Sequence, residues 1–191
     1  MTKRIHQLLL IATFVPLCWL TMQAVHELGH VVCAVATGGT VAKVVLHPLA
    51  ISRTDTSGSS HPMLVAWAGP AIGVAVPLAL LAFVKAAMAK WDYLVQFFAG
   101  FCLIANGAYV GVGSFQGIGD AGDLIRQGSP IGSLWLFGMA AVPLGLCLWN
   151  GLGPRFGLGQ AEGKVDGVAA YLSSALLLLV VVLEVAFSPS Q

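Results

Sequence analysis

Five long apolar segments constrain the fold of this chain more than any other feature. Each is at least about 18 residues long, enough for an α-helix to cross the hydrocarbon core of a bilayer. They cover residues 5–37, 63–87, 91–112, 131–149 and 168–187. Of the 191 residues, 58% are hydrophobic and only 9% are charged, whereas soluble domains usually carry about a quarter charged residues. The sequence predicts an all-α integral membrane protein with about five transmembrane helices.

A short β-hairpin is expected between the first and second helices. The stretch TVAKVVLHPLAISRTDTSGSSH, residues 40–61, is rich in β-branched residues, is interrupted by Pro48 and ends in a Ser/Gly cluster, a pattern typical of a hairpin. Gly38 and Gly39 are expected to cap the first helix. The later stretch SFQGIGDAGDLIRQGSP, residues 114–130, is expected to form a glycine-rich loop.

The N-terminal segment also resembles a secretory signal, with two basic residues, an apolar run and the small-residue ending MQA. Cleavage after Ala24 would remove the helix that carries His26, so we favour the uncleaved chain. The basic residues then favour a cytoplasmic N-terminus. Six of them fall on that side and three on the other: Lys3, Arg4, Lys85, Lys90, Arg155 and Lys164 against Lys43, Arg53 and Arg126.

The stretch AVHELGHVVC, residues 24–33, places an H-E-x-x-H motif inside the first apolar segment. On a helix, His26 and His30 project from one face, one turn apart. Two imidazoles so placed can bind one zinc ion, with Glu27 as the general base that takes a proton from water. A polar cluster within a helix bundle and a pair of haem ligands are the alternatives. Ionisable groups are costly inside a membrane, and this cost favours a bound metal.

A catalytic zinc site usually takes three protein ligands, so a third must come from elsewhere in the chain. His47, His61, Asp120 and Asp123 are the candidates. The third apolar segment returns the chain to the side of the membrane that the motif approaches, which favours Asp120, whose flanking glycines allow close approach. Asp123 remains the alternative ligand, although we expect it to be either a solvated loop acid or the cap of a short helix, DLIRQG.

These features resemble the site-2 protease family of zinc-dependent intramembrane metalloproteases, here in a small form without accessory soluble domains. HELGH lies in a first transmembrane helix followed by TGG, AGP stands at residues 68–70, and DAGDL follows the third helix where the family usually shows DGG. The resemblance covers residues 5–127. It implies one Zn²⁺ per chain, held by His26, His30 and Asp120, with Glu27 as the catalytic base.

The same resemblance suggests substrate-binding roles for Asn106, Gly69 and Pro70, although a packing role for each is an alternative. Gly73 stands where the family often has Asn, and neither Asn nor Pro precedes Asp120 as it usually does. We expect residues 1–127 to form the protease core and residues 128–191 to add two transmembrane helices.

The expected function is therefore zinc-dependent intramembrane endopeptidase activity on membrane-embedded substrates, as in regulated intramembrane proteolysis. The expected partners are the lipid bilayer, a transmembrane protein substrate and a regulatory membrane protein, and no nucleic acid, since the net charge is only +1. The expected location is a prokaryotic plasma membrane. The alternative is a non-catalytic membrane protein that keeps a protease-like fold, binds metal or transports it.

Overall fold

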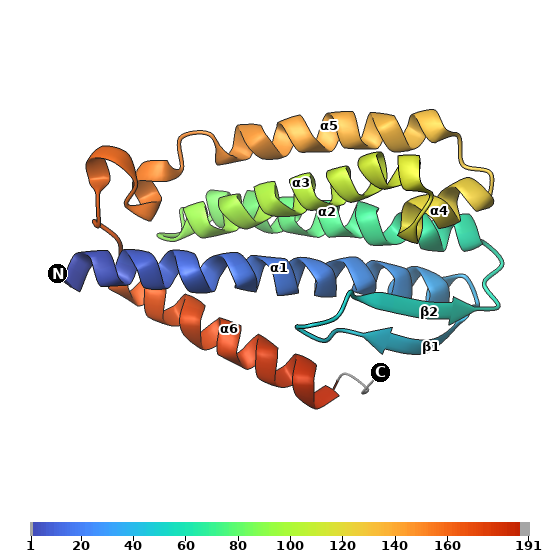
Figure 1. Ribbon diagram of the computed structural model, residues 1–191, viewed down its shortest axis with the longest axis horizontal. Helices are drawn as coiled ribbons and strands as arrows, with labels where there is room; N and C mark the ends of the chain where they lie inside the picture. Colours follow the sequence, from blue (N-terminus) through green and yellow to red (C-terminus); the bar gives the residue numbers. More distant parts are fainter. Residues whose placement is uncertain (1, 188–191) are drawn as a thin grey trace.

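Five helices long and apolar enough to cross a membrane dominate the computed structural model, which describes residues 2–187 (Figure 1). Their bounds are α1 Thr2–Ala36, α2 Pro62–Ala86, α3 Asp92–Gln116, α5 Ile131–Trp149 and α6 Gly167–Phe187. The antiparallel strands β1 (Thr40–Val45) and β2 (Arg53–Ser57) form a hairpin between α1 and α2. The predicted fold class, an all-α membrane protein with this hairpin, is confirmed.

The chain differs from the sequence expectation after α3. The stretch 114–130, expected as a glycine-rich loop with at most a short helix capped by Asp123, contains the helix α4, Gly119–Arg126, in which Asp123 is an interior residue. Gly117 ends α3 with a left-handed backbone, φ +64°, and Gly119 has φ +55°. These two glycines allow the tight turn that starts a new helix almost at once, so glycine content was a misleading sign of a loop.

Helices α1, α2 and α3 form the centre of the bundle, and α5 and α6 pack on its two sides. α1 packs on α2, α2 on α3, and α5 covers the other side of α3, while α6 crosses α1 on the opposite side of the molecule (Figure 1). Two short 3-10 turns, Gly153–Phe156 and Gly159–Ala161, connect α5 to α6.

Small residues let α3 and α5 come together closely. A Cβ built on Gly107 would lie 2.8 Å from the Cβ of Ala141, and one on Gly138 would lie 2.9 Å from the carbonyl oxygen of Gly107. Such close backbone approach is how helices associate in lipid, where no hydrophobic driving force acts between them.

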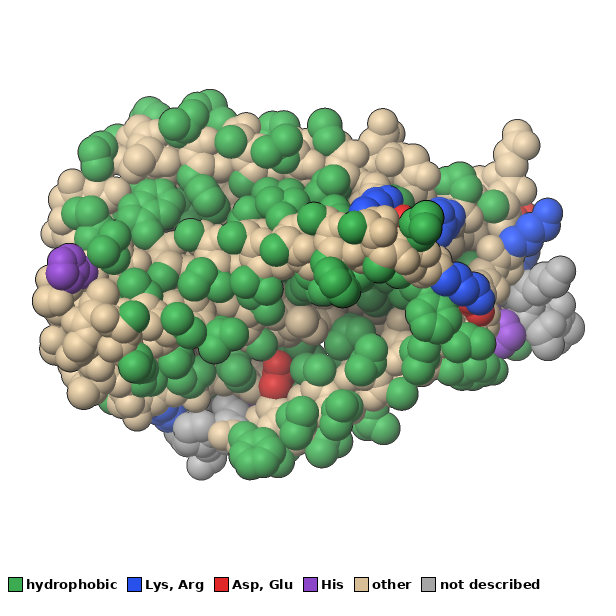
Figure 2. Space-filling view, turned by 180° about the vertical axis from the view of Figure 1, so that it is seen from behind, with side chains coloured by type: hydrophobic (Ala, Val, Ile, Leu, Met, Phe, Trp, Pro, Cys, Tyr) green, Lys and Arg blue, Asp and Glu red, His purple; other side chains and the backbone are tan. Residues whose placement is uncertain are grey.

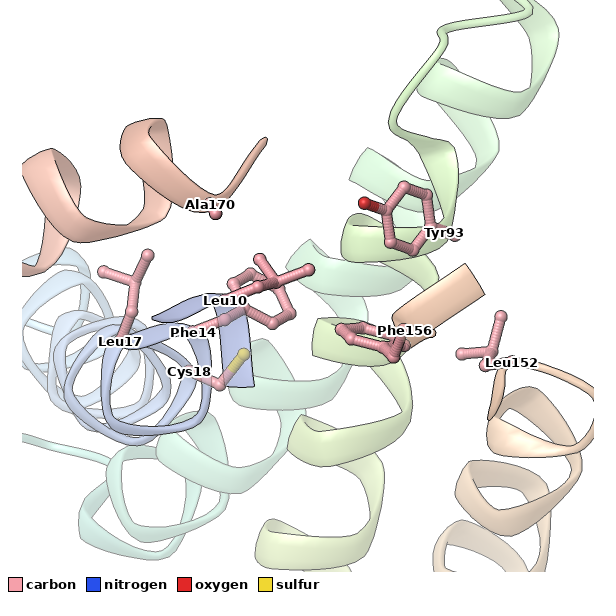
Figure 3. Packing of buried hydrophobic residues seen from close by; sticks show 8 residues of the cluster. All are labelled: Leu10, Phe14, Leu17, Cys18, Tyr93, Leu152, Phe156 and Ala170. Atoms are coloured by element: carbon pink, nitrogen blue, oxygen red, sulfur yellow. The ribbon is translucent and has the colours of Figure 1, made fainter. Parts of the chain in front are cut away.

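Large side chains pack together at the end of the bundle that contains the N-terminal half of α1. Phe156 of the first 3-10 turn lies between Tyr93 and Leu152 (Figure 3) and contacts the ring of Tyr93 edge-on, with centroids 5.3 Å apart. Phe14 of α1 joins the same cluster. This packing holds the N-terminal half of α1 against α3 and the α5–α6 connection, and so sets the direction in which the C-terminal half of α1 continues.

The hairpin does not extend away from the bundle but runs back along the C-terminal half of α1 (Figure 1). Gly38, with φ +76°, and a hydrogen bond from the Gly39 N–H to the Ala34 carbonyl (2.8 Å) end α1, as expected for a glycine cap. The outer face of the molecule is largely hydrophobic, and most of the Lys and Arg side chains visible on it lie toward the end that carries the N-terminus (Figure 2).

Candidate metal centre

The H-E-x-x-H motif lies in the C-terminal half of α1, within the membrane-spanning part. His26 and His30 are each 6% exposed, and their side chains project from one face of the helix. Their Nε2 atoms stand 3.1 Å apart. The helical spacing therefore converges two imidazole nitrogens on one point, as the sequence predicts.

Asp120 reaches the same point from the first turn of α4. Its Oδ2 lies 2.7 Å from the Nε2 of His26 and 3.3 Å from the Nε2 of His30. Asp120 is thus poised to act as a carboxylate between two imidazoles 90 or more residues away in the chain.

The other candidate ligands do not join this cluster, although Asp123 lines the same cavity. Asp123 forms an ion pair with Arg126 on the exposed side of α4. His47 accepts a hydrogen bond from the Leu49 N–H (3.2 Å), and His61 bonds the hydroxyl of Ser60 (2.8 Å). In the described part of the chain, only His26, His30 and Asp120 gather as a potential metal-binding group.

A second layer of hydrogen bonds orients the two imidazoles. The Nδ1 of His26 lies 2.7 Å from the Oδ1 of Asn106 on α3, and the Nδ1 of His30 lies 2.8 Å from the carbonyl oxygen of Val65 on α2. Both acceptors draw the ring proton to Nδ1, which leaves each Nε2 with a free lone pair. Such outer partners fix the tautomer and orientation of metal-ligating histidines.

Gly69 makes room for this arrangement. A Cβ there would lie 2.8 Å from the Nε2 of His26 and would overlap the ring of His30. Gly69 and Pro70 are both buried and neither lines the cavity described below. Gly69 thus lies against the ring edges that carry the Nε2 atoms, and the substrate-binding roles of Gly69 and Pro70 stay predictions.

Asn106 is only 1% exposed, and both ends of its amide are engaged. Oδ1 meets His26, and Nδ2 donates to the carbonyl of Cys102 at 2.9 Å. A Cβ on Gly73 would lie 2.9 Å from either amide atom, so the glycine found where the family often has Asn opens the space that Asn106 fills.

Glu27 is buried, with 4% of its surface exposed, and it points to the hairpin. The hydroxyl of Thr54 on β2 donates a hydrogen bond to Oε2 of Glu27 at 2.6 Å. Oε1 remains for another partner, so the carboxylate is held in place by one oxygen and presents the other.

A cavity of about 910 Å³ opens beside these residues. Its wall includes His26, Glu27, His30 and Asp120, and β2 together with the residues before it forms the opposite side. A volume of this size falls in the range of ligand-binding clefts. Water and an extended peptide segment therefore have space next to the carboxylate of Glu27.

The donor set fits a zinc ion. Two imidazole lone pairs and a carboxylate oxygen stand 2.7–3.3 Å apart, and three electron-rich atoms this close repel one another unless a cation lies between them. Zinc with ligands at about 2.0–2.2 Å in tetrahedral geometry holds neighbouring donors roughly 3.3 Å apart. A small outward shift of Asp120 and His26 brings the observed set to that spacing.

Three contributors to the site were missed by sequence reasoning: Thr54, Tyr109 and the carbonyl of Val65. Thr54 and Val65 carry no local signal, because their roles depend on how the hairpin and α2 pack on α1. Tyr109 did carry one, since it stands three residues after Asn106 and therefore on the same face of α3.

Comparison with known proteins identifies the family of the chain. The Peptidase M50B-like family model matches residues 5–110, a range that includes the HELGH motif and Asn106 and ends ten residues before Asp120. No curated protein and no solved structure matches the chain. Because the family match spans more than half of the sequence, the chain belongs to the Peptidase M50B-like family, a family of site-2 protease-type membrane metallopeptidases.

Proposed function

We propose that this protein is a zinc-dependent intramembrane endopeptidase that hydrolyses peptide bonds of membrane-embedded substrates. The observation that carries the proposal is the convergence of His26, His30 and Asp120 on one point beside a buried Glu27. His26 and His30 would hold zinc through Nε2 and Asp120 through Oδ2.

Zinc, when bound there, supplies Lewis acidity that lowers the pKa of water from 15.7 to about 7 and polarises the peptide carbonyl. Glu27 accepts the proton of the attacking water, through the oxygen that Thr54 does not occupy. It then delivers that proton to the nitrogen of the leaving amine. Burial of Glu27 keeps bulk water away from this transfer.

The hairpin gives an extended substrate a place to bind. β2 pairs with β1 along one edge only, and residues 50–59 line the cavity. An unwound segment of a transmembrane substrate would pair with the other edge of β2, as peptides do when they extend a sheet. Unwinding exposes the carbonyls that a helix keeps in its own hydrogen bonds.

The proposal divides the chain at residue 127. Every side chain of the site comes from α1, α3, α4 or β2, and Gly69 and the Val65 carbonyl come from α2, so residues 1–127 form the proposed catalytic core. Residues 128–191 add α5 and α6, which pack on α3 and α1 respectively. The distribution of basic residues supports a cytoplasmic N-terminus.

Metal transport is the competing function. A transport path needs further ligands along its length, but residues 2–187 contain a single group of potential ligands. Glu184, buried on α6, is not a member of that group. Hydrolysis also gives Glu27 a task, which transport does not.

Replacing Glu27 by Gln tests the proposed mechanism. The amide keeps the size of the side chain and its bond to Thr54 but accepts no proton at neutral pH. We expect Glu27→Gln to keep one zinc per chain and to lose cleavage of single-span reporter peptides in proteoliposomes. Such peptides carry a dye at each end and a Gly-Pro pair that weakens their helix.

The matched control is Glu162→Gln. It removes an exposed carboxylate that forms an ion pair with Arg4 and belongs to the α5–α6 connection, outside the site. This control should cleave as the wild type does. Cleavage by Glu27→Gln at the wild-type rate, or absence of cleavage by the zinc-loaded wild type, would overturn the proposal.

A further inference from the structure

Tyr109 is a polar side chain of the cavity wall that the mechanism above does not use. It lies on α3, one helical turn beyond Asn106, and 41% of its surface is exposed. Its ring meets the ring of His26 edge-on, with centroids 5.9 Å apart and planes at 74°. The phenol therefore packs directly against one of the two histidines.

The hydroxyl of Tyr109 is held by the helix that carries Asp120. The backbone N–H of Asp120 donates to the hydroxyl oxygen at 3.3 Å. This bond uses an acceptor site of the oxygen and leaves its hydrogen free. Within residues 2–187 the hydroxyl donates to no acceptor at hydrogen-bond distance.

Gly119 leaves the space that this hydroxyl occupies. A Cβ there would lie 2.8 Å from the Cζ of Tyr109 and would overlap the hydroxyl oxygen. The left-handed backbone of Gly119, φ +55°, also disfavours any side chain. The turn into α4 thus has two effects. It brings Asp120 to the histidines, and it leaves room for the Tyr109 hydroxyl beside the backbone of Asp120.

Two other polar hydrogens near the ligand atoms are already engaged. The Thr54 hydroxyl donates to Glu27, and the Asn106 amide donates to the carbonyl of Cys102. Arg53, which also lines the cavity, stands 3.6 Å from the carboxylate of Asp55. Tyr109 therefore offers an unused hydroxyl donor in the cavity wall, with its ring against His26 and its oxygen on the backbone of Asp120.

We propose that Tyr109 is a catalytic residue that donates a hydrogen bond to the substrate carbonyl oxygen as this atom becomes an oxyanion. The water oxygen forms a bond to the carbonyl carbon, one water proton passes to Glu27, and the carbonyl electron pair moves onto the oxygen that Tyr109 stabilises. The pair then returns, the C–N bond breaks, and the amine takes the proton from Glu27. Tyr109 keeps its own proton throughout.

This inference rests on the proposed endopeptidase function and adds a donor where negative charge develops. Donors aimed at an oxyanion stabilise the transition state more than the ground state. A residue that only positioned Asp120 through its backbone N–H would act through metal retention instead. Loss of the hydroxyl would lower kcat if Tyr109 stabilises the oxyanion, and would lower zinc content if Tyr109 only positions Asp120.

The test is Tyr109→Phe, which removes the hydroxyl and keeps the ring against His26. We expect kcat for reporter cleavage to fall by about 10²–10³-fold, as for removal of one oxyanion donor, with zinc content and KM unchanged. Binding of a phosphinate peptide, whose tetrahedral oxygens resemble the oxyanion, to the variant should weaken by a comparable factor. Tyr171→Phe, on α6 beside His6, is the matched control and should behave as the wild type.

Two results would overturn the proposal while leaving the endopeptidase function intact. One is Tyr109→Phe with wild-type kcat, measured beside an inactive Glu27→Gln. The other is a loss of zinc that accounts for the whole loss of activity, which would make Tyr109 a positioning residue for Asp120. Absence of cleavage by the wild type would instead remove both proposals.

Discussion

At the scale of single residues, the hydrogen-bond partners of His26 and His30 determine the geometry of the metal centre. His26 and His30 would be free to turn about their side-chain bonds if only the helix held them. Asn106 and the Val65 carbonyl each take one ring nitrogen, at 2.7 and 2.8 Å, and so aim the other nitrogen at Asp120. A buried amide on α3 thereby controls a donor atom on α1.

Removing the amide of Asn106 should weaken metal binding without removing a ligand. Loss of an outer-shell partner of a ligating histidine typically costs 10–100-fold in metal affinity, so we expect Asn106→Ala to bind zinc about 10–100-fold more weakly. Asn106→Asp keeps an oxygen acceptor for the Nδ1–H of His26 and should restore most of the affinity. Competition with a chelator of known affinity measures the difference.

The control for this prediction is Asn150→Ala, which changes an exposed asparagine at the end of α5. Its zinc affinity should match that of the wild type. If Asn106→Ala binds zinc as tightly as Asn150→Ala, the orienting role of Asn106 is wrong.

At the scale of elements, the site depends on how closely α1 approaches α2. A Cβ on Gly29 would lie 2.9 Å from the Ala68 carbonyl carbon and 3.0 Å from the Cα of Gly69. Glycines on both helices thus let the backbones meet at the level of the motif, a common mode of packing in membranes. This contact is what allows the His30 ring to reach the Val65 carbonyl.

Gly69→Ala should therefore damage both the fold and the metal site. The added methyl overlaps the His30 ring and lies 2.8 Å from the Nε2 of His26, and overpacking of this kind costs about 1–3 kcal/mol. We expect a lower thermal midpoint in detergent and a loss of bound zinc, measured on the same sample.

Gly132→Ala on α5 is the comparison, because a Cβ there meets nothing within 4 Å. Without a clash, alanine favours a helix over glycine by up to about 1 kcal/mol, so this variant should keep its zinc and its midpoint should not fall. Equal behaviour of the two variants would contradict the close packing of α1 and α2.

At the scale of the whole molecule, the two ends of the bundle differ in what they carry. The N-terminus, the α2–α3 turn and the α5–α6 connection lie at one end, and α4 with the start of the hairpin at the other (Figure 1). α1 has 35 residues, about 52 Å at 1.5 Å per residue, which exceeds the ~30 Å hydrocarbon core. His26 lies ten residues before the end of α1, about 15 Å along its axis, which places the site within the end that carries α4.

The distribution of basic residues predicts that the α4 end faces away from the cytoplasm. In a variant without its native cysteines, Arg126→Cys should react with a membrane-impermeant maleimide in intact cells. Lys164→Cys should react only after the cells are made permeable. The reverse pattern would place the site on the cytoplasmic side and contradict the proposed orientation.

Much of this organisation could be predicted from the sequence, because it depends on local periodicity and length. Apolar runs fix the five helices, Gly38 fixes the end of α1, and the four-residue spacing of His26 and His30 fixes their common face. The bond from Thr54 to Glu27 could not be predicted, since it depends on the hairpin folding back along α1. The start of α4 before Asp120 could not be predicted, because glycines that permit a tight turn look the same in sequence as glycines in a loop.

The role of Asp120 could be predicted from the sequence only in part. Its side of the membrane follows from counting helices, but its contact with both histidines requires the turn at Gly117 and Gly119 and the rotation of α4. The same rotation directs Asp123 to Arg126 instead. Topology could narrow the choice to two acids, and only the packed structure separates them.

The assignment of His26, His30 and Asp120 as zinc ligands is tested by the zinc content of four purified proteins. We expect one zinc per chain in the wild type and in Asp123→Ala, and a loss of zinc in His26→Ala and Asp120→Ala. The Asp123 variant removes an acid from the same short helix and so controls for disturbance of α4. Equal zinc content in the wild type, His26→Ala and Asp120→Ala, or a loss confined to Asp123→Ala, would contradict the site.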